Sequence, residues 1–182
     1  MDFLRGKSVS LCPLSREDLS LIRQWSNDPE LRGLTGAVTP MGEADGDKFF
    51  EKVYSSEDRL WFSVWLPAED KMIGEAGLLR MFPAWRTTDM TIIIGDKEAW
   101  GKGYGLEVAE LLLDYAFGYL NFHRVSIGVV GFNARALKFW EKAGFRQEGI
   151  QREGYYYKHR YHDFVMMSIL EDEYRKQFQG PV

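Results

Sequence analysis

Trp100-Gly101-Lys102-Gly103-Tyr104-Gly105 is the stretch of this sequence that decides the fold. Three glycines in five residues allow a tight turn and let a ligand approach the backbone closely. The apolar, β-branched run Met90–Ile94 before the turn is typical of a strand buried on both faces. Apolar residues spaced three and four apart from Leu106 to Leu120 predict a helix after it. The first N–H groups of such a helix favour an anion, so the turn predicts a phosphate or pyrophosphate site.

Two other phosphate-binding patterns do not fit this stretch. A dinucleotide-binding fingerprint would need a third glycine at the position of Leu106 or Val108, depending on where counting begins. The phosphate-loop NTPase pattern needs Gly-Lys followed by Ser or Thr, which is absent from the turn. A tight strand-to-helix turn without any ligand is the alternative that this stretch leaves open.

The residues after the helix extend the same architecture. The run His123–Val130 reads as another strand, Asn133 caps a short helix that ends near Gly144, and Phe145 opens a further strand. Near the N-terminus, Ser15–Asp18 predicts a capped start of a helix that ends at about Asn27.

A second helix is expected from Asp45 to Ser55, with a loop from Pro29 to Gly42 before it. This first third of the chain is expected to decide the choice of substrate. Its acidic residues, together with the net charge of −4, favour a cationic amine over nucleic acid as the partner. These acidic residues are Glu43, Asp45, Asp47 and Glu51. A solvated helix face is the alternative.

Four separated motifs carry a resemblance to a known family: Gly101–Gly105, Leu112–Phe117, Asn133–Ala136 and Glu141–Phe145. They resemble the GNAT superfamily of acetyl-CoA-dependent N-acetyltransferases, and most of all its Rim-type branch. Glu148-Gly149, Arg152 and Asp163 follow in the order usual for that branch. The resemblance covers most of the chain, from Leu11 to about Leu170.

The resemblance implies a single α/β domain over residues 1–182, with a core of about 8–170. It implies a mixed sheet of six or seven strands that splays between two parallel central strands, flanked by about four helices. Acetyl-CoA is the implied cosubstrate, with its pyrophosphate on the turn. The implied cofactor-binding residues are Trp100, Gly101, Lys102, Gly103, Tyr104, Gly105, Asn133 and Arg135. Asn133 would contact the pantetheine arm, a role compatible with capping a helix.

Acetyl transfer to an ammonium requires a base, and two carboxylates are candidates. Asp89 begins the strand before the glycine turn and resembles the position of a catalytic glutamate in the family. Glu75 lies in Ile73-Gly74-Glu75-Ala76-Gly77, where alternation places it on the same face as the apolar Ile73, an unusual place for a charge. Asp89 as a turn residue and Glu75 as an edge carboxylate in water are the alternatives.

The general acid departs from the family pattern. Many members carry a tyrosine before Glu-Lys in the helix after the asparagine, but this chain has Phe139-Trp140 before Glu141. An indole N–H donates a hydrogen bond but does not titrate usefully. Water, the substrate ammonium or a tyrosine from Tyr155–Tyr157 would have to protonate the thiolate instead.

The aromatic, histidine and cysteine residues indicate which other kinds of site the protein has. Tyr155–Tyr157 and Trp61-Phe62 are candidates for an acceptor pocket or a homodimer face. The three histidines are scattered, with His159 and His162 expected on opposite faces of a strand, so no metal site is predicted. The single Cys12 reads as a small buried hydrophobe.

Composition and the N-terminal sequence predict where the protein acts. No apolar stretch of signal-peptide or membrane-spanning type is present in the 182 residues, so a cytoplasmic location without a membrane partner is expected. Three functions are in view: an N-acetyltransferase acting on a primary amine in a ternary complex, a catalytically weak acyl-CoA-binding or regulatory module, and a structural domain. The acceptor, whether a protein N-terminus, a polyamine or an amino sugar, is not named by the sequence.

Overall fold

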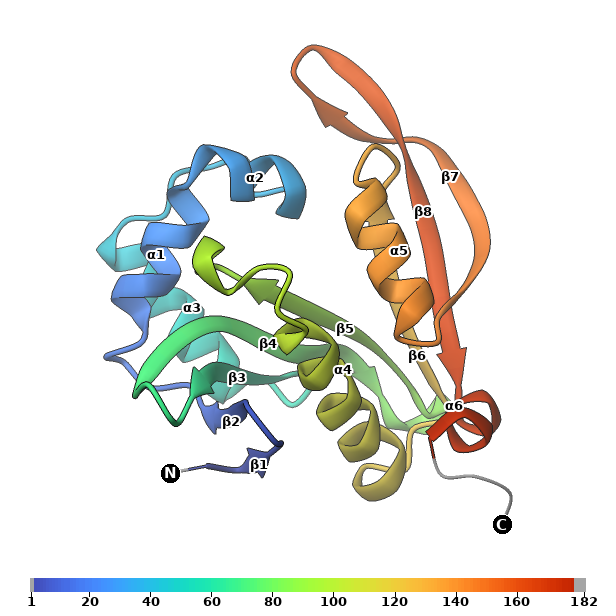
Figure 1. Ribbon diagram of the computed structural model, residues 1–182. Coiled ribbons are helices and arrows are strands. Elements are labelled where there is room, and N and C mark those ends of the chain that lie inside the picture. The colour runs from blue at the N-terminus through green and yellow to red at the C-terminus, as the bar shows by residue number, and fades with distance from the viewer. Residues whose placement is uncertain (1, 179–182) are drawn as a thin grey trace. The chain divides into compact units, whose positions relative to one another are not determined.

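Eight strands belong to one mixed sheet in the part of the chain that this computed structural model describes, residues 2–178 (Figure 1). Their order is β1-β2-β3-β4-β5-β6-β8-β7. β5 and β6 run parallel, whereas β6 and β8 are antiparallel. The strands are β1 (Leu4–Arg5), β2 (Ser10–Pro13), β3 (Leu60–Leu66), β4 (Lys71–Phe82), β5 (Thr87–Ile94), β6 (Arg124–Val130), β7 (Arg146–Tyr157) and β8 (Arg160–Leu170).

Six α-helices accompany these strands within residues 2–178. They are α1 (Leu19–Asn27), α2 (Pro29–Thr35), α3 (Glu43–Ser55), α4 (Tyr104–Asp114), α5 (Ala134–Lys142) and α6 (Glu171–Phe178). The α/β class is confirmed, with somewhat more elements than the expected six or seven strands and four helices. β1 has two residues and α2 has seven, and elements this short leave little periodicity in a sequence. None of the helices in residues 2–178 is both long and apolar enough to cross a bilayer.

Two compact units divide the chain, and each is described by itself. The first unit contains the residues up to Leu79 together with Thr91–Leu112. The second unit contains Arg80–Met90 and the residues from Leu113 onward. β4 and β5 each contribute residues to both units.

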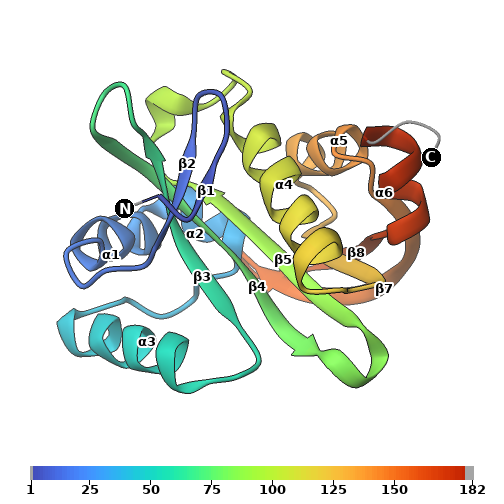
Figure 2. The same cartoon turned by 90° about the horizontal axis from the view of Figure 1, so that it is seen from below.

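The first unit is built on the antiparallel strands β1 to β4. α1 and α3 lie on one face of these strands, and the first turns of α4 lie on the other (Figure 2). The apolar cluster under α1, α2 and α3 contains Leu14, Ile22, Trp25, Leu31, Val53 and Met72. Gly95 lies directly against Trp25 of this cluster, so that an added Cβ would come within 2.0 Å of the indole. These contacts join the segment after β5 to the helices.

The segment expected to be a loop from Pro29 to Gly42 contains α2, which corrects that expectation. Asp28 caps α2, because its side chain accepts hydrogen bonds from the backbone N–H groups of Glu30 and Leu31. Gly36, with a φ of 81°, ends the helix in the left-handed conformation. The sequence signal was the Asp28-Pro29 pair, since proline favours the first helical position.

Cys12 also differs from expectation. It lies in β2 and is half-buried rather than fully buried. Its Sγ donates to Asp2 Oδ1 at 3.7 Å. Burial and the nearby Asp2 carboxylate raise the pKa of the thiol, which keeps it protonated.

The second unit begins where β5 pairs with β6, from Thr87 with Arg124 to Asp89 with Ser126. Every residue of β6 pairs with a residue of β8, and β7 and β8 form the long hairpin seen in Figure 1. α5 lies beside this hairpin in both ribbon views. α5 begins at the predicted cap, Asn133, whose Oδ1 accepts from the Ala136 N–H at 3.1 Å.

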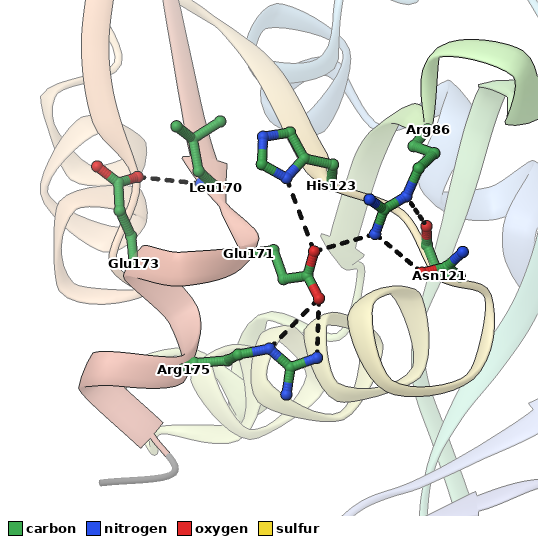
Figure 3. A network of polar contacts seen from close by, with 7 residues as sticks. All are labelled: Arg86, Asn121, His123, Leu170, Glu171, Glu173 and Arg175. Carbon is green, nitrogen blue, oxygen red and sulfur yellow. Dashed lines mark hydrogen bonds and ion pairs between the residues drawn. The ribbon is translucent and has the colours of Figure 1, made fainter. Parts of the chain in front are cut away.

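A polar network ties α6 to the strands of the second unit (Figure 3). Glu171, at the start of α6, accepts hydrogen bonds from Arg175 at 2.8 Å and from Arg86 at 3.0 Å. Arg86 also donates to the Asn121 side chain at 2.8 Å. His123 Nδ1 lies 3.7 Å from the same Glu171 oxygen that Arg86 contacts. These contacts hold the β4–β5 turn, the start of β6 and α6 together.

Two sequence expectations around α4 are modified. Met90 is buried, but residues 91–94 are half-buried, so β5 is not covered on both faces along its whole length. The helix expected up to Leu120 ends as an α-helix at Asp114 and continues as a single π-helical segment, Tyr115–Tyr119. Gly118 and Tyr119 in that segment are exposed.

Candidate active site

The glycine turn is an exposed connection between β5 and α4 in the first unit. A short 3-10 segment, Lys97–Ala99, follows β5, and α4 begins at Tyr104. Gly101 and Gly103 have φ values of +75° and +88°, a region that L side chains rarely adopt. No described protein atom lies within 4 Å of a Cβ added at either glycine. The predicted strand, turn and helix are therefore present, and the outer side of the turn is open.

The backbone of the turn presents unused donors. The N–H groups of Leu106 and Glu107 both donate to the carbonyl of Gly103, which is how α4 begins. By contrast, none of the five N–H groups of residues 101–105 donates to another residue among 2–178. Free N–H groups at a helix start, on a turn that side chains leave open, suit a phosphate or pyrophosphate. The exposed Lys102 adds a positive charge to the same turn.

Trp100, predicted to bind the cofactor, holds the turn to the protein. Its Nε1 donates to the carbonyl of Ile94 at 2.7 Å. Its ring packs against the apolar cluster that contains Trp25 and Leu31. Just before it, Lys97 forms ion pairs of 2.9 Å with Asp28 and with Glu30, at the start of α2. The indole of Trp100 is thus an anchor for the turn, while the turn's own backbone is what a ligand would meet.

Glu75 lies in the middle of β4, also in the first unit. It pairs with Ser63 of β3, and the next pair on the same face of the two strands is Trp61 with Gly77. Glu75 Oε2 accepts a hydrogen bond from Trp61 Nε1 at 2.7 Å, and the glutamate is only 5% exposed. It is therefore not an edge carboxylate in water. The sequence offered Trp61 only as an aromatic residue of a pocket or interface. Its hydrogen bond to Glu75 depends on the register between two strands, which the sequence does not record.

The face occupied by Glu75 differs in detail from the simple alternation expected. The register shifts between Val64 and Trp65, so that Val64 pairs with Gly74 and Trp65 pairs with Met72. Because this shift skips one residue of β4, Met72 lies on the same face of the sheet as Glu75. Met72 belongs to the apolar cluster under α1, α2 and α3, and Trp61 packs against it, so Glu75 faces the helix-covered side.

The surroundings of Glu75 change its acidity. Burial raises the pKa of Glu75 from its ordinary 4.5 to about 7, and the hydrogen bond from Trp61 opposes this rise. A carboxyl group with a pKa near 7 exchanges protons close to neutral pH, as a general base at that pH requires. Buried carboxylates with shifted pKa values are enriched at functional sites.

Asp89, the other predicted base, lies in the second unit, where its carboxylate forms an ion pair with Arg80. It accepts a hydrogen bond from Arg80 Nε at 2.5 Å, and Arg80 Nη2 contacts the same carboxylate oxygen. The Arg80 backbone has a φ of 50°, a conformation that residues other than glycine rarely adopt. The carboxylate thus belongs to an ion pair, and of the two candidates Glu75 has the environment of a base.

Asn133 and Arg135 lie at the start of α5 in the second unit. The Asn133 Oδ1 is used in capping, whereas its Nδ2 donates to no other residue among 2–178. Arg135 is exposed in the first helical turn. Trp140, which replaces the usual tyrosine, is 5% exposed and contacts the rings of Phe139 and Phe145. Its role is in the core.

Tyr155–Tyr157, His159 and His162 all lie on the β7–β8 hairpin. Burial raises the pKa of Tyr155, so this hydroxyl stays protonated at neutral pH. His159 is in the hairpin turn, with a φ of 66°, and not on a strand as expected, whereas His162 is on β8. Between residues 2 and 178, no three His, Cys, Asp or Glu side chains gather where they could hold a metal ion.

Comparison with known proteins decides the family. The model of the acetyltransferase (GNAT) domain matches residues 9–146, about three quarters of the chain. The chain belongs to the GNAT acetyltransferase family. The resemblance noted in the sequence is therefore confirmed at the level of the family.

GNAT relatives match over nearly the whole chain. Spermidine N(1)-acetyltransferase of Vibrio cholerae is 33% identical over 93% of this chain and 96% of its own. The probable N-acetyltransferase YjcK of Bacillus subtilis is 28% identical over 93% of this chain and 98% of its own. Among solved structures, spermidine N-acetyltransferase from Vibrio cholerae in complex with CoA and spermine aligns with a TM-score of 0.87 at 27% identity, over 93% of this chain and 99% of that one.

These matches establish the reaction type. The protein is an N-acetyltransferase that uses acetyl-CoA and transfers the acetyl group to an amine. The open glycine turn, with its free N–H groups, fits the pyrophosphate of that cosubstrate. These relatives are not specific to the Rim-type branch, so the matches support the family more firmly than the branch.

Proposed function

We propose that this N-acetyltransferase acetylates an alkylamine of the polyamine class by direct attack within a ternary complex. The matching enzyme of Vibrio cholerae, similar both in sequence and in its solved structure, is named for spermidine, which supports this class of acceptor. The acidic residues of α3, which in the sequence favour a cationic amine, support this acceptor class only in part. Asp47 and Glu51 both contact Arg16, and Glu43 lies 3.8 Å from Arg23, so part of that charge is neutralised within the protein.

The observation that carries the proposal is the glycine turn. Its five N–H groups from Gly101 to Gly105 have no partner among residues 2–178, and the turn is fixed by the Trp100 anchor. Backbone N–H donors that are held in place and open to a ligand are expected where a pyrophosphate binds. Asn133 and Arg135 are proposed to contact the rest of the cofactor, with Asn133 Nδ2 as the free donor toward the pantetheine arm.

The proposed chemistry needs two protons to leave the ammonium nitrogen and one proton to reach the sulfur. Acetyl-CoA supplies a thioester, which is already activated toward amines. Glu75 accepts the ammonium proton, directly or through a water, so that the nitrogen lone pair attacks the carbonyl carbon. The C–N bond forms as the C–S bond breaks, the nitrogen then gives up its second proton, and the thiolate gains one proton, relayed by water or by a tyrosine such as Tyr155. The products are the amide and CoA thiol.

A catalytically weak acyl-CoA-binding module is the second candidate function. The observation that favours it is Trp140, which is buried where the family often has a tyrosine and which offers no titratable proton. Both functions share the glycine turn. They differ in whether thiol is released when an amine is present.

A turnover screen tests the proposed function. Thiol release from acetyl-CoA is measured with polyamines, N-terminal peptides and amino sugars. Release with spermidine or spermine supports the proposal, whereas binding of acetyl-CoA without release by any amine supports the binding module. Preference for peptides would overturn the acceptor class.

Gly103→Glu tests the site within the same proposal. The substitution adds bulk and negative charge to a turn where φ is +88°, so acetyl-CoA binding should be lost. Gly118→Glu is the matched control, because Gly118 is exposed in the π-helical segment and has no positive φ. Retained affinity in the Gly103 variant would contradict the site.

The broader predictions accompany this proposal. We infer that the chain forms one N-acetyltransferase domain with a core of about residues 8–170, that it acts in the cytoplasm, and that it forms a homodimer. Light scattering measures the last of these directly. The Rim-type branch would be supported by turnover with a ribosomal-protein N-terminal peptide that exceeds turnover with polyamines.

A further inference from the structure

Four aromatic side chains gather on one face of the β7–β8 hairpin in the second unit, and we call them the hairpin aromatic cluster. They are Phe132, from the connection between β6 and α5, Tyr155 and Tyr157 of β7, and His162 of β8. The Phe132 ring centroid lies 5.6 Å from that of Tyr157, 6.1 Å from Tyr155 and 4.8 Å from His162. Phe132 is 41% exposed. The cluster therefore has ring surface that a ligand can reach.

Strand register explains why these rings share a face. Tyr155 pairs with His162 in the antiparallel hairpin, and Tyr157 is two residues further along the same strand. The intervening Tyr156 pairs with Tyr161, and these two rings contact each other on the opposite face, with centroids 5.0 Å apart. Tyr161 is 64% exposed, so the two faces of one hairpin offer a matched comparison.

The backbone around the cluster is fixed by one aspartate. The register of β7 shifts between Gln151 and Tyr155, and Glu153 there has a φ of 54°. Asp163 Oδ1 accepts from the Glu153 N–H at 3.0 Å, while the Asp163 carbonyl accepts from the Gly131 N–H at 2.8 Å. Asp163 thus ties the bulge that places Tyr155 and Tyr157 to the connection that carries Phe132.

The position of the cluster relates it to the acceptor. Phe132 immediately precedes Asn133, which caps α5 and which is proposed above to contact the pantetheine arm. An acceptor must reach the acetyl group carried at the end of that arm. A recognition surface that adjoins Asn133 is therefore well placed for the amine.

An ammonium already lies on this surface. Lys158, in the hairpin turn, has its Nζ 5.3 Å from the centroid of the Tyr157 ring. A cation within about 6 Å of a ring face is attracted by the negative face of the π system. Since Lys158 carries a primary ammonium on an alkyl chain, it has the same chemistry as the end of an alkylamine acceptor. The Tyr157 face is thus accessible to such a group.

We propose that the hairpin aromatic cluster binds an ammonium group of the acceptor by cation–π contact, and that Lys158 is an internal cation which the acceptor displaces. The inference rests on the proposed function, because it assigns the recognition of the same alkylamine. It makes Phe132 and Tyr157 determinants of acceptor specificity, and it makes Lys158 a competitor for the same ring face.

The test compares substitutions that change the ring with others that change the competing charge. Tyr157→Leu should raise the KM for spermidine about 2- to 30-fold and leave the KM for acetyl-CoA unchanged, since a cation–π contact is worth roughly 0.5–2 kcal/mol. Tyr157→Phe, which keeps the ring, and Tyr161→Leu, on the opposite face, should keep the KM for spermidine. Lys158→Met should lower it about 2- to 5-fold, whereas Lys158→Arg should not.

A binding measurement separates this inference from the proposed function. Calorimetric titration of spermidine into protein saturated with CoA should show the same order of affinities as the KM values. Thiol release by the wild type combined with equal KM values in Tyr157→Leu and Tyr161→Leu would overturn the cluster's role. No thiol release with any amine would overturn the proposed function, and spermidine binding that weakens in Tyr157→Leu would still support the cluster. An unchanged acceptor KM in Lys158→Met would overturn the role of Lys158.

Discussion

The buried carboxylate of Glu75 accepts a 2.7 Å hydrogen bond from the indole Nε1 of Trp61 on the neighbouring strand. Two effects on the same group oppose each other here. Burial favours the neutral carboxyl and raises its pKa, whereas the indole donor favours the carboxylate and lowers it. The balance, a pKa of about 7, sets the pH at which Glu75 can accept a proton.

Glu75→Gln should lower kcat by about 10²- to 10⁴-fold, because a general base contributes about that much to a proton-transfer step. In the wild type, the logarithm of kcat/KM should rise with pH and level off near pH 7, where Glu75 becomes deprotonated. The variant should lose that limb. Initial rates of thiol release from pH 5.5 to 9 measure both effects. A wild-type limb that persists in Glu75→Gln would show that another group titrates.

Trp61→Phe should move the same limb to higher pH. The substitution removes the donor that lowers the Glu75 pKa but keeps a ring beside Phe49. The pH profile of kcat/KM reports the shift. Trp65→Phe is the matched control, since Trp65 Nε1 donates to Ser63 and not to Glu75. Equal displacement of the limb in both variants would refute the role of the Trp61 hydrogen bond.

The free energy of unfolding should also depend on pH because of Glu75. Its folded pKa lies above the ordinary value, so the folded state holds more protons between pH 4.5 and 7, and stability falls as the pH rises through that window. The contribution is about 3 kcal/mol between the two limits. Urea unfolding at pH 5 and pH 8 measures it, and Glu75→Gln should show a smaller difference. The idea fails if wild type and variant respond identically.

Asp89→Asn should reduce kcat by less than about tenfold, because the Asp89 carboxylate is engaged by Arg80 and has no proton-transfer role in the proposed mechanism. Kinetics of Asp89→Asn beside Glu75→Gln decide between the two predicted bases. A larger loss in the Asp89 variant would transfer the assignment to Asp89.

Glu171→Gln should destabilise the protein at neutral pH. Hydrogen bonds from Arg175, and then from Arg86, lower the pKa of Glu171 (Figure 3). A lowered folded pKa contributes stability above the ordinary value of 4.5, and this stability is lost as the pH falls through the folded pKa. The expected loss at pH 7 is about 1.5–3 kcal/mol. Urea unfolding of both proteins should converge toward pH 3; a constant difference would argue against ionic contacts.

Local patterns were enough to predict the strand, turn and helix around the three glycines and the capped start of α5. The glycine spacing and the apolar helix that follows it are properties of adjacent residues, as is the Asn133 cap. Asp28-Pro29 carried an equally local signal for α2, and that signal was overlooked.

Contacts between strands could not be predicted in this way. Glu75 meets Trp61 because the register of β3 and β4 pairs Ser63 with Glu75, and no single stretch of sequence records which residues of two strands will face each other. The Arg80–Asp89 ion pair similarly joins residues of two different strands, and Arg80 has a left-handed backbone, which an arginine rarely adopts.

The anchoring of Trp100 to Ile94 and to the apolar core has a kinetic consequence. A turn that is already held in shape before the ligand arrives loses little conformational freedom when the ligand binds. Encounter with acetyl-CoA should then proceed in a single phase whose observed rate increases linearly with cosubstrate concentration, without the plateau that a slow ordering step would impose.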